Sequence, residues 1–200
     1  MSTRGSYGVR IDGKDKLAFN HWDSYPGSLG AELVSAFQRA LKEYGVEELA
    51  DLARHLRLIA EDKPVTEEEY DKYCEMLDTR QEYASGMQWY ALAQEVQGKL
   101  IINLRAGVML SSPEFILDSL FCEWAYIFNF DEGVFEVYKG FQEEPHTHGR
   151  FSHMFKEYRH RNGKPDVKQF HPCALIKAYP FHEIPDDWVA QIELMTKEDE

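Results

Sequence analysis

Alternating apolar and polar positions predict two β-hairpins. Residues 6–11 and 16–20 alternate with a period of two, and the polar run 12–15 between them is typical of a hairpin turn. Residues 123–130 and 134–139 alternate in the same way around a short polar turn. We therefore expect two antiparallel strand pairs, one near each end of the chain.

Between the hairpins the apolar residues recur at helical spacing. Residues 29–44 predict a first amphipathic helix, which Gly45 ends. Residues 46–59 predict a second helix. Thr66 and Glu69 form a capping box, which predicts the start of a third.

The remaining segments are shorter. Residues 86–96 predict a fourth helix or a continuation of the third, and residues 99–108 fit a strand or a helix equally well. Ser112 followed by proline predicts a short helix to about Leu120. Residues 172–179 predict a fifth strand, and a final helix is expected to begin near residue 184 and to end near Leu194.

These elements predict a single α+β domain over residues 1–200. Its sheet is antiparallel and consists of the two hairpins and the C-terminal strand. A helical block at about residues 29–97 is inserted between the hairpins and packs on one sheet face. An acidic tail follows at about residues 195–200.

Composition and cysteine spacing indicate the cellular compartment to expect. A chain of 200 residues buries about 70% of its unfolded surface and needs neither a disulfide nor a metal to stabilise a core. No apolar run is long enough to span a membrane, and residues 1–10 lack the apolar region of a signal peptide. The three cysteines show no C-x-x-C spacing, which favours reduced thiols and a cytoplasmic protein.

The formal net charge is −13, and it is uneven. Residues 31–97 carry 15 acidic side chains against 7 basic ones. This sign makes nucleic-acid binding unlikely. It is compatible with simple solubility, with mimicry of nucleic acid, or with docking on a basic partner.

Four stretches, in order, resemble a family of bacterial and phage proteins for which no activity is established. They are TRGSYGVRIDGKDKLAFNHWDSYPGSLG, QWYALAQEVQG, DSLFCEWAYIFNFDEGVFEVYKGFQ and AYPFHEIP. The resemblance implies a compact, phage-encoded accessory protein that acts in host takeover or defence evasion, and it assigns no catalytic residue. Where the family has glycine after the initiating methionine this chain has Ser2, so we expect no N-terminal nucleophile.

The run N-H-W-D-S-Y-P at residues 20–26 is the first candidate site. If the strand continues through it, His21, Asp23 and Tyr25 face the same way. Asp23 would then orient the His21 imidazole as a general base. The ligand-binding candidates around this pair are Arg4, Arg10, Asn20 and Tyr25, with the two arginines as anion binders.

A structural interpretation of the same run is preferred. Asp23 and Ser24 precede a Pro-Gly turn, where their side chains satisfy backbone donors. Trp22 and Tyr25 would anchor the corner to the core. In this interpretation His21 is the residue that has no structural role.

A histidine-rich region is the second candidate. Two pairs at i, i+2 spacing offer nitrogen and sulfur donors for zinc: His146, His148, His171 and Cys173. Neither pair has the spacing of a known zinc module, so surface histidines are preferred and neither a metal nor a cofactor is expected.

Residues 150–168 are locally basic and contain interleaved aromatic rings. Such a segment can hold phosphates and stack on bases, but a solvated loop that balances the acidic helices is the preferred interpretation. Cys122 and Glu123, beside aromatic residues, are expected to be packed rather than reactive.

The sequence contains no G-x-S-x-G, P-loop, G-x-G-x-x-G or H-E-x-x-H motif. The first hypothesis is therefore a non-enzymatic cytoplasmic protein that binds a host or cellular protein, or a small phosphate-bearing ligand. The alternative is a hydrolase that uses His21 and Asp23 with Arg4 or Arg10. The sequence does not indicate an oligomeric state.

Overall fold

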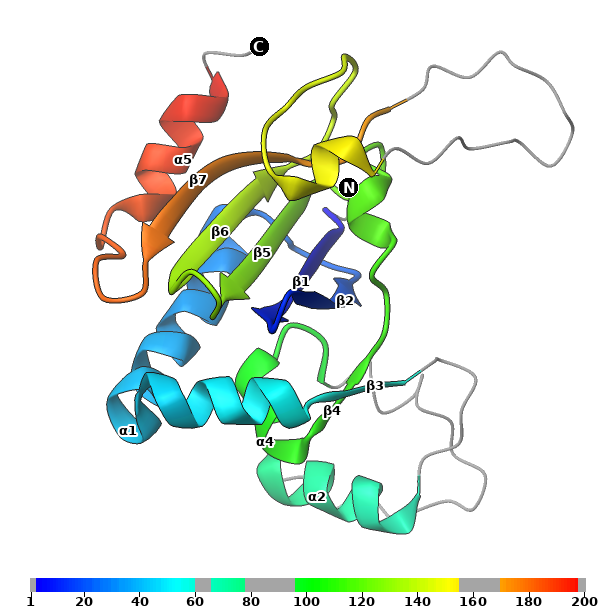
Figure 1. The fold of residues 1–200 in the computed structure, drawn as a ribbon, viewed down its shortest axis with the longest axis vertical. Helices are drawn as coiled ribbons and strands as arrows, with labels where there is room; N and C mark the ends of the chain where they lie inside the picture. The colour runs from blue at the N-terminus through cyan, green and yellow to red at the C-terminus, as the bar shows by residue number, and fades with distance from the viewer. Residues whose placement is uncertain (1–2, 60–65, 78–95, 155–169, 198–200) are drawn as a thin grey trace, which may run out of the picture.

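A five-stranded sheet lies at the centre of the computed structural model, which describes residues 3–59, 66–77, 96–154 and 170–197 (Figure 1). The strands are β1 (Gly5–Ile11), β2 (Lys14–Asn20), β5 (Trp124–Asn129), β6 (Val134–Lys139) and β7 (Ala174–Pro180). Their order is β2-β1-β5-β6-β7. The predicted α+β class, with two hairpins and a C-terminal strand, is confirmed.

One junction in the sheet differs from the prediction. Neighbouring strands are antiparallel except β1 and β5, which pair in parallel with Gly5 opposite Trp124. The connection between the two hairpins returns to the end of the sheet from which β1 started. The connection from β2 to β5 begins and ends at the same end of the sheet, so β5 runs antiparallel to β2 and parallel to its neighbour β1. Alternation within a strand does not predict which strands become neighbours.

The first hairpin turn is tighter than predicted. Asp12 and Gly13 both have positive φ, 51° and 73°, which is the backbone of a two-residue turn between right-twisted strands. The carboxylate of Asp131, in the second hairpin turn, accepts hydrogen bonds from the backbone N–H groups of Asp12 (2.7 Å) and Gly13 (2.9 Å). The two hairpin turns are thereby joined.

Helix α1 (Ala31–His55) follows a π-helical turn at Pro26–Gly30 and contains a kink at Gly45 (φ 79°, ψ 166°). The kink confirms the predicted break between two helical segments. The second segment ends at His55 rather than at residue 59, because Lys16 donates from its Nζ to the carbonyls of Ala53, Arg54 and Leu56.

The residues after α1 form a strand instead of the predicted last helical turn. β3 (Arg57–Ile59) pairs in parallel with β4 (Val108–Leu110). Backbone bonds to a partner about fifty residues away replace the helical bonds there.

The other helices are short. α2 (Glu67–Leu77) confirms the helix predicted from the capping box, and α4 (Leu100–Ala106) settles the ambiguous segment as a helix. α5 (Trp188–Lys197) extends past the predicted end at Leu194. Except for Val96, the helix predicted at 86–96 lies outside the described residues, and so do residues 198–200 of the predicted tail.

The predicted helix at 112–120 is wrong in extent. The structure has a single 3₁₀ turn, η2 (Phe115–Leu117). Ser112 N–H donates to the carbonyl of Leu17, and the carbonyl of Ile116 accepts from Cys173 N–H. The segment therefore combines short turns of its own with backbone bonds to its neighbours and forms no continuous helix.

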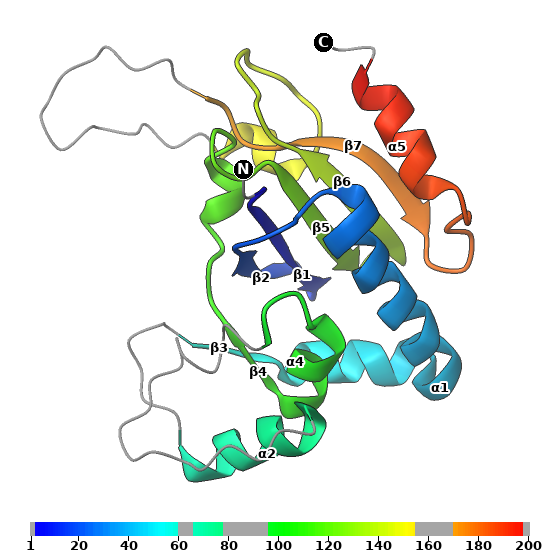
Figure 2. The ribbon, with the colours of Figure 1, turned by 180° about the vertical axis from the view of Figure 1, so that it is seen from behind.

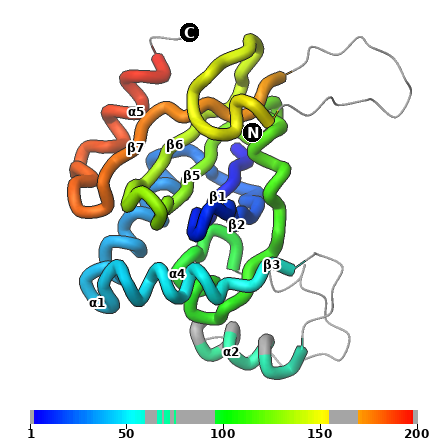
Figure 3. The backbone as a smooth tube through the Cα atoms, in the orientation of Figure 1, coloured from blue at the N-terminus to red at the C-terminus, as the bar shows by residue number. Residues whose placement is uncertain are grey.

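Both faces of the sheet are covered. Figure 2 shows α1 across one face, with α5 beside it near β7. Figure 3 shows residues 111–123 and the turn η3 (Arg150–His153) on the other face. A large hydrophobic cluster fills the α1 side, and a smaller one around Ile116, Cys122, Tyr138, Phe151 and Cys173 fills the other. No helix among the described residues is long and apolar enough to cross a membrane.

Candidate ligand-binding groove

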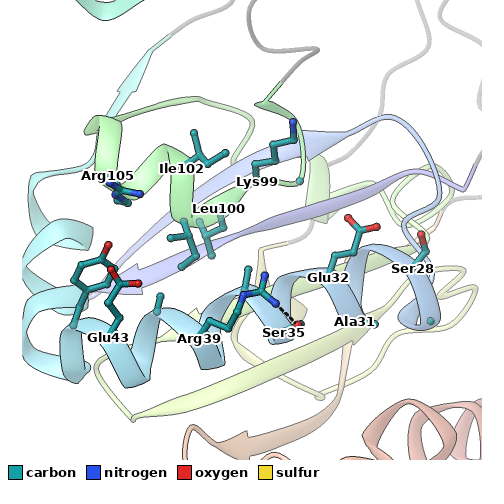
Figure 4. Close-up of a pocket in the computed structure, with 16 residues that line it drawn as sticks. Ser28, Ala31, Glu32, Ser35, Arg39, Glu43, Lys99, Leu100, Ile102 and Arg105 are labelled. Atoms are coloured by element: carbon teal, nitrogen blue, oxygen red, sulfur yellow. Dashed lines mark hydrogen bonds between the residues drawn. The ribbon is translucent and has the colours of Figure 1, made fainter. Parts of the chain in front are cut away.

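Helices α1 and α4 line an open groove of about 730 Å³ (Figure 4). Its α1 wall begins in the turn before the helix, at Gly27 and Ser28, and continues to Tyr44 beside the kink. Its α4 wall runs from Gly98 to Arg105. The groove therefore lies between a segment that follows the first hairpin and one about seventy residues later.

Small side chains on α1 leave the room for this groove. Ala31 and Ser35 lie on the face of α1 toward α4, with Leu100 opposite them (Figure 4). Ala36 and Ala40 also line the groove. Residues at i, i+4 spacing share one face of a helix. This regular spacing is the sequence signal that could have revealed the groove, and the sequence analysis did not single it out.

Charged groups border the groove on both walls. Figure 4 shows Lys99 and Arg105 at the two ends of the α4 wall, with Glu32 and Glu43 on the α1 wall and Arg39 between them. Arg39 donates to the Ser35 hydroxyl at 2.7 Å. Within the described part of the chain, none of the three cations forms an ion pair.

One end of the groove contains a phenol. A hydrogen bond with Glu43 is the largest cause that raises the pKa of Tyr44, and burial and the charges of Glu43 and Glu48 add to it. Arg105 acts in the opposite direction. Tyr44 is thus a neutral hydrogen-bonding group at neutral pH, close to both a carboxylate and a guanidinium.

The α4 wall is attached to the sheet through Tyr7 of β1. Asn103 donates from Nδ2 to the Tyr7 hydroxyl oxygen at 3.2 Å, and Gly98 also hydrogen-bonds this oxygen through its backbone. Burial raises the pKa of Tyr7 to about 12 despite these two hydrogen bonds. The hydrogen bonds of Gly98 and Asn103 to Tyr7 fix the position of the α4 wall relative to β1.

The N-H-W-D-S-Y-P corner lies at the other end of the groove. The backbone N–H of His21 donates to Gln97 Oε1 at 3.0 Å, and Gly98 packs against Leu29 so closely that an added Cβ would lie 2.8 Å from its Cδ1. The corner is therefore in direct contact with the segment that begins the α4 wall.

Buried polar groups hold the corner. Asn20 donates from Nδ2 to the Ser24 hydroxyl (2.8 Å) and to the Trp22 carbonyl, and Ser24 is fully buried. Ser24 N–H donates to the Thr3 carbonyl at 3.0 Å, and the Tyr126 hydroxyl donates to the Ser24 carbonyl at 2.9 Å. Asn20 and Ser24 therefore fix the corner as internal partners.

The predicted catalytic pair lies outside a strand. β2 ends at Asn20, and Asp23 has φ 48°, so the alternation that would align His21, Asp23 and Tyr25 does not continue. The His21 ring is half-buried, 5.6 Å from the Phe19 ring and 4.1 Å from the Trp22 ring, measured between centroids. Asp23 is exposed.

The predicted anchoring of the corner by its rings is wrong. Trp22 is 63% exposed and Tyr25 is 45% exposed. The inward positions of the corner are occupied by Ser24 and Pro26, which are both buried. The left-handed backbone at Asp23 turns the neighbouring side chains outward.

The two predicted anion binders lie at opposite ends of β1, about 20 Å apart at the rise of a strand. Arg10 pairs with Asp15 at 2.8 Å and with Asp131 at 3.5 Å. The Arg4 guanidinium lies 5.3 Å from the centroid of the Phe121 ring. The structure therefore does not bring Arg4, Arg10 and His21 into one cleft.

The two predicted pairs lie near each other, but their side chains are not grouped as metal ligands among the described residues. His146 Nε2 hydrogen-bonds the Pro172 carbonyl at 2.7 Å, and its ring centroid lies 6.1 Å from that of His148. Cys173 is buried and its thiol donates to the Cys122 carbonyl at 3.2 Å. Among the residues that the structure describes, including His171, no three His, Cys, Asp or Glu side chains are grouped to hold a metal ion.

Cys122 is packed, as expected. It is fully buried, and burial raises the pKa of its thiol well above the usual range, with Cys173 adding to the effect. A thiol in this state is protonated at neutral pH and is a poor nucleophile.

Arg150 is the residue that sequence reasoning placed wrongly. It was expected in a solvated basic loop, of which residues 155–169 lie outside the described residues. Arg150 instead pairs with Asp15 (2.6 Å) and Glu136 (2.6 Å) and donates to the Tyr138 hydroxyl (2.8 Å). We call Asp15, Glu136, Tyr138 and Arg150 the buried ion cluster.

The buried ion cluster is saturated rather than reactive. Burial alone would lower the pKa of Arg150, but hydrogen bonds to Asp15 and the charges of Tyr138 and Glu136 raise it above its ordinary value. Burial, followed by the charge of Glu136, raises the pKa of Tyr138. Each group already has a partner, so the cluster serves to join β2, β6 and η3.

The fold and the groove define a class: an α+β protein with an open, cation-bordered groove beside its central sheet. Comparison with protein-family models, with curated proteins and with solved structures finds no match for this chain. The resemblance to a bacterial and phage family therefore stays a prediction, and the functional argument rests on the groove itself.

Proposed function

We propose that the protein is a non-enzymatic binding protein and that the α1–α4 groove holds a small phosphate-bearing ligand. The observation that carries the proposal is the placement of Arg39, Lys99 and Arg105, which approach the groove from both walls without an ion pair among the described residues. Arginine and lysine bind phosphate through charge-assisted hydrogen bonds.

The overall charge of −13 does not outweigh this local arrangement. At physiological ionic strength the Debye length is about 8 Å, so exposed carboxylates elsewhere on the chain are largely screened. Around the groove itself three cations face two carboxylates, Glu32 and Glu43. The local balance favours an anion.

The composition of the groove supports binding rather than chemistry. Its described lining contains no His or Cys, and the Ser35 hydroxyl accepts a hydrogen bond from Arg39, not from a base. Leu100, Ile101 and the alanines of α1 supply an apolar surface for the rest of a ligand. A phosphate-bearing molecule with an apolar part fits both properties.

Thermal unfolding with pyrophosphate, and separately with inorganic phosphate, tests the proposal. At ten times its dissociation constant a ligand stabilises the folded state by about 1.4 kcal/mol, which raises Tm by about 3–6 °C for a protein of this size. The variants Lys99→Gln and Arg105→Gln should lose most of this rise, because each removes one cation from the α4 wall.

Lys42→Gln is the matched control. Lys42 is an exposed lysine of α1 that does not line the groove, so its removal changes the net charge by the same amount. It should keep the full rise in Tm. An equal loss in Lys42→Gln and Lys99→Gln would mean that anion binding depends on the net charge of the protein and not on the groove. If neither anion raises Tm, the proposal is wrong.

A further inference from the structure

Large aromatic side chains are exposed together at one end of the sheet. Trp22 (63% exposed), Tyr25 (45%), Phe121 (45%) and Phe141 (46%) account for half of the large exposed hydrophobic residues in the described part of the chain. We call these four rings, with Asp23 and Arg4, the end-of-sheet surface. Exposed rings gathered in this way are typical of interaction sites.

The strand register shows that these residues lie at one end of the sheet. Gly5 of β1 lies opposite both Asn20 of β2 and Trp124 of β5, and Trp124 lies opposite Lys139 of β6. Trp22 and Tyr25 follow β2, Arg4 precedes β1, Phe121 precedes β5 and Phe141 follows β6. These four segments therefore meet at the same end of the sheet.

Backbone hydrogen bonds connect the loops into one surface. Ser24 N–H donates to the Thr3 carbonyl (3.0 Å), and Glu123 N–H donates to the Arg4 carbonyl (3.0 Å). Gly140 N–H then donates to the Glu123 carbonyl (2.8 Å). The corner, the N-terminal segment and the loops before β5 and after β6 are thus joined edge to edge.

The buried hydrogen bonds of the corner do not use the side chains of Trp22 and Asp23. Asn20 and Ser24 make its buried hydrogen bonds, and Pro26 is buried. Trp22 and Asp23 point outward from this fixed backbone. A tryptophan exposed at this level on a rigid turn is available to a partner without rearrangement.

Rings of this edge already accept cations from the same chain. The Arg4 guanidinium lies 5.3 Å from the Phe121 ring centroid. The Lys139 ammonium lies 4.3 Å from the Trp124 ring centroid and 5.6 Å from that of Phe141. No Lys or Arg among the described residues lies over the ring of Trp22 or Tyr25. Of the aromatic side chains, tryptophan attracts a cation most strongly.

Charge selects the kind of partner. Asp23 places an exposed carboxylate between the two rings in sequence, and Glu144 is exposed in the loop after Phe141. Rings that prefer cations and bordering carboxylates both favour a basic partner over an acidic one or a nucleic acid.

We propose that the end-of-sheet surface docks a basic segment of a partner protein, with Lys or Arg side chains on the faces of Trp22 and Tyr25 and Asp23 as their counter-charge. None of these residues lines the α1–α4 groove, so the surface acts independently of the proposed ligand. Success or failure at one site does not decide the other.

Fluorescence anisotropy of a labelled peptide of alternating Arg and Gly tests this docking in 0.15 M salt. A Glu-Gly peptide of equal length and a single-stranded oligonucleotide serve as competing classes. Cation–π contacts of this kind predict that Trp22→Ala weakens binding of the Arg-Gly peptide about fivefold to tenfold without changing the net charge. Asp23→Asn should weaken it about threefold, and asparagine is compatible with the positive φ at this position.

Two control variants separate the surface from the general acidity of the chain. Leu194→Ala removes a side chain that is 66% exposed on α5, and Glu68→Gln removes an exposed carboxylate on α2. Both should leave the affinity unchanged within about twofold, because distant exposed charges are screened at this ionic strength. If Asp23→Asn and Glu68→Gln have the same effect, if Trp22→Ala has none, or if the oligonucleotide binds more tightly than the Arg-Gly peptide, the proposal is wrong.

Discussion

Replacement of Arg150 by methionine tests whether the buried ion cluster holds the molecule together. Methionine keeps an unbranched apolar stem of similar shape but removes the guanidinium. The change leaves Glu136, which is 3% exposed, without its partner at 2.6 Å. It leaves Asp15 with its second partner, Arg10, at 2.8 Å.

The expected loss follows from these two environments. Removing one member of a buried ion pair costs about 3–5 kcal/mol, because the remaining charge stays desolvated. Glu136 keeps hydrogen bonds from Asn129 Nδ2 (2.8 Å) and the Tyr138 hydroxyl (3.0 Å), which reduces the loss. The Asp15 side chain is 18% exposed and still paired, so it adds little. We expect the free energy of unfolding to fall by about 3 kcal/mol, a large part of the 5–15 kcal/mol typical of a domain.

Urea unfolding, followed by circular dichroism, measures this loss as a lower midpoint at an unchanged slope. A second variant identifies the cause. When Glu136→Gln is added to Arg150→Met, the buried charge disappears, the amide oxygen still accepts from Asn129 Nδ2, and the amide N–H can donate to the Tyr138 hydroxyl oxygen. At least half of the lost free energy should return. A loss below about 1 kcal/mol in Arg150→Met, or no recovery in the double variant, would refute the reasoning.

Two further outcomes follow from single positions. Because the folded-state pKa of Tyr7 is about 12 and its ordinary value is 10.0, its stabilising effect is complete below pH 10 and disappears as the pH rises through 12. This loss is about 3 kcal/mol, and Tyr7→Phe should show a correspondingly flatter decline over pH 10–12 in urea titrations. Gly45→Ala should lower the free energy of unfolding by about 1–3 kcal/mol, because φ 79° with ψ 166° is a region that only glycine adopts readily. An unchanged midpoint in Gly45→Ala would mean that α1 straightens without cost.

Local patterns were sufficient for elements whose signals lie within a few residues. The first hairpin and the helix that follows Thr66 belong to this group, although the hairpin turn has two residues instead of the four predicted. Residues 56–59 show the limit. Their apolar spacing continues that of α1, but Lys16 ends the helix and β4 provides a strand partner. Neither contact is visible in a local window.

The candidate sites show the same limit more strongly. The groove brings α1 beside α4, and the buried ion cluster brings Arg150 to Asp15, which is 135 positions away in sequence. A charged residue in a polar stretch predicts solvent exposure unless its partners are known. At the corner, the prediction assumed a continuing strand, and the positive φ of Asp23 changed which side chains face outward.

The corner at residues 20–28 is where the two proposed sites come nearest to each other. Gly27 and Ser28 line the groove, whereas Trp22 and Tyr25 belong to the end-of-sheet surface. The backbone between them is held by buried hydrogen bonds at Ser24, to the Thr3 carbonyl and from the Tyr126 hydroxyl. Coupling between two sites requires an element with two arrangements, and a turn fixed from both sides by buried bonds resists a second one. Because this turn is rigid, we expect the ligand in the groove and the partner on the end-of-sheet surface to bind without influencing each other.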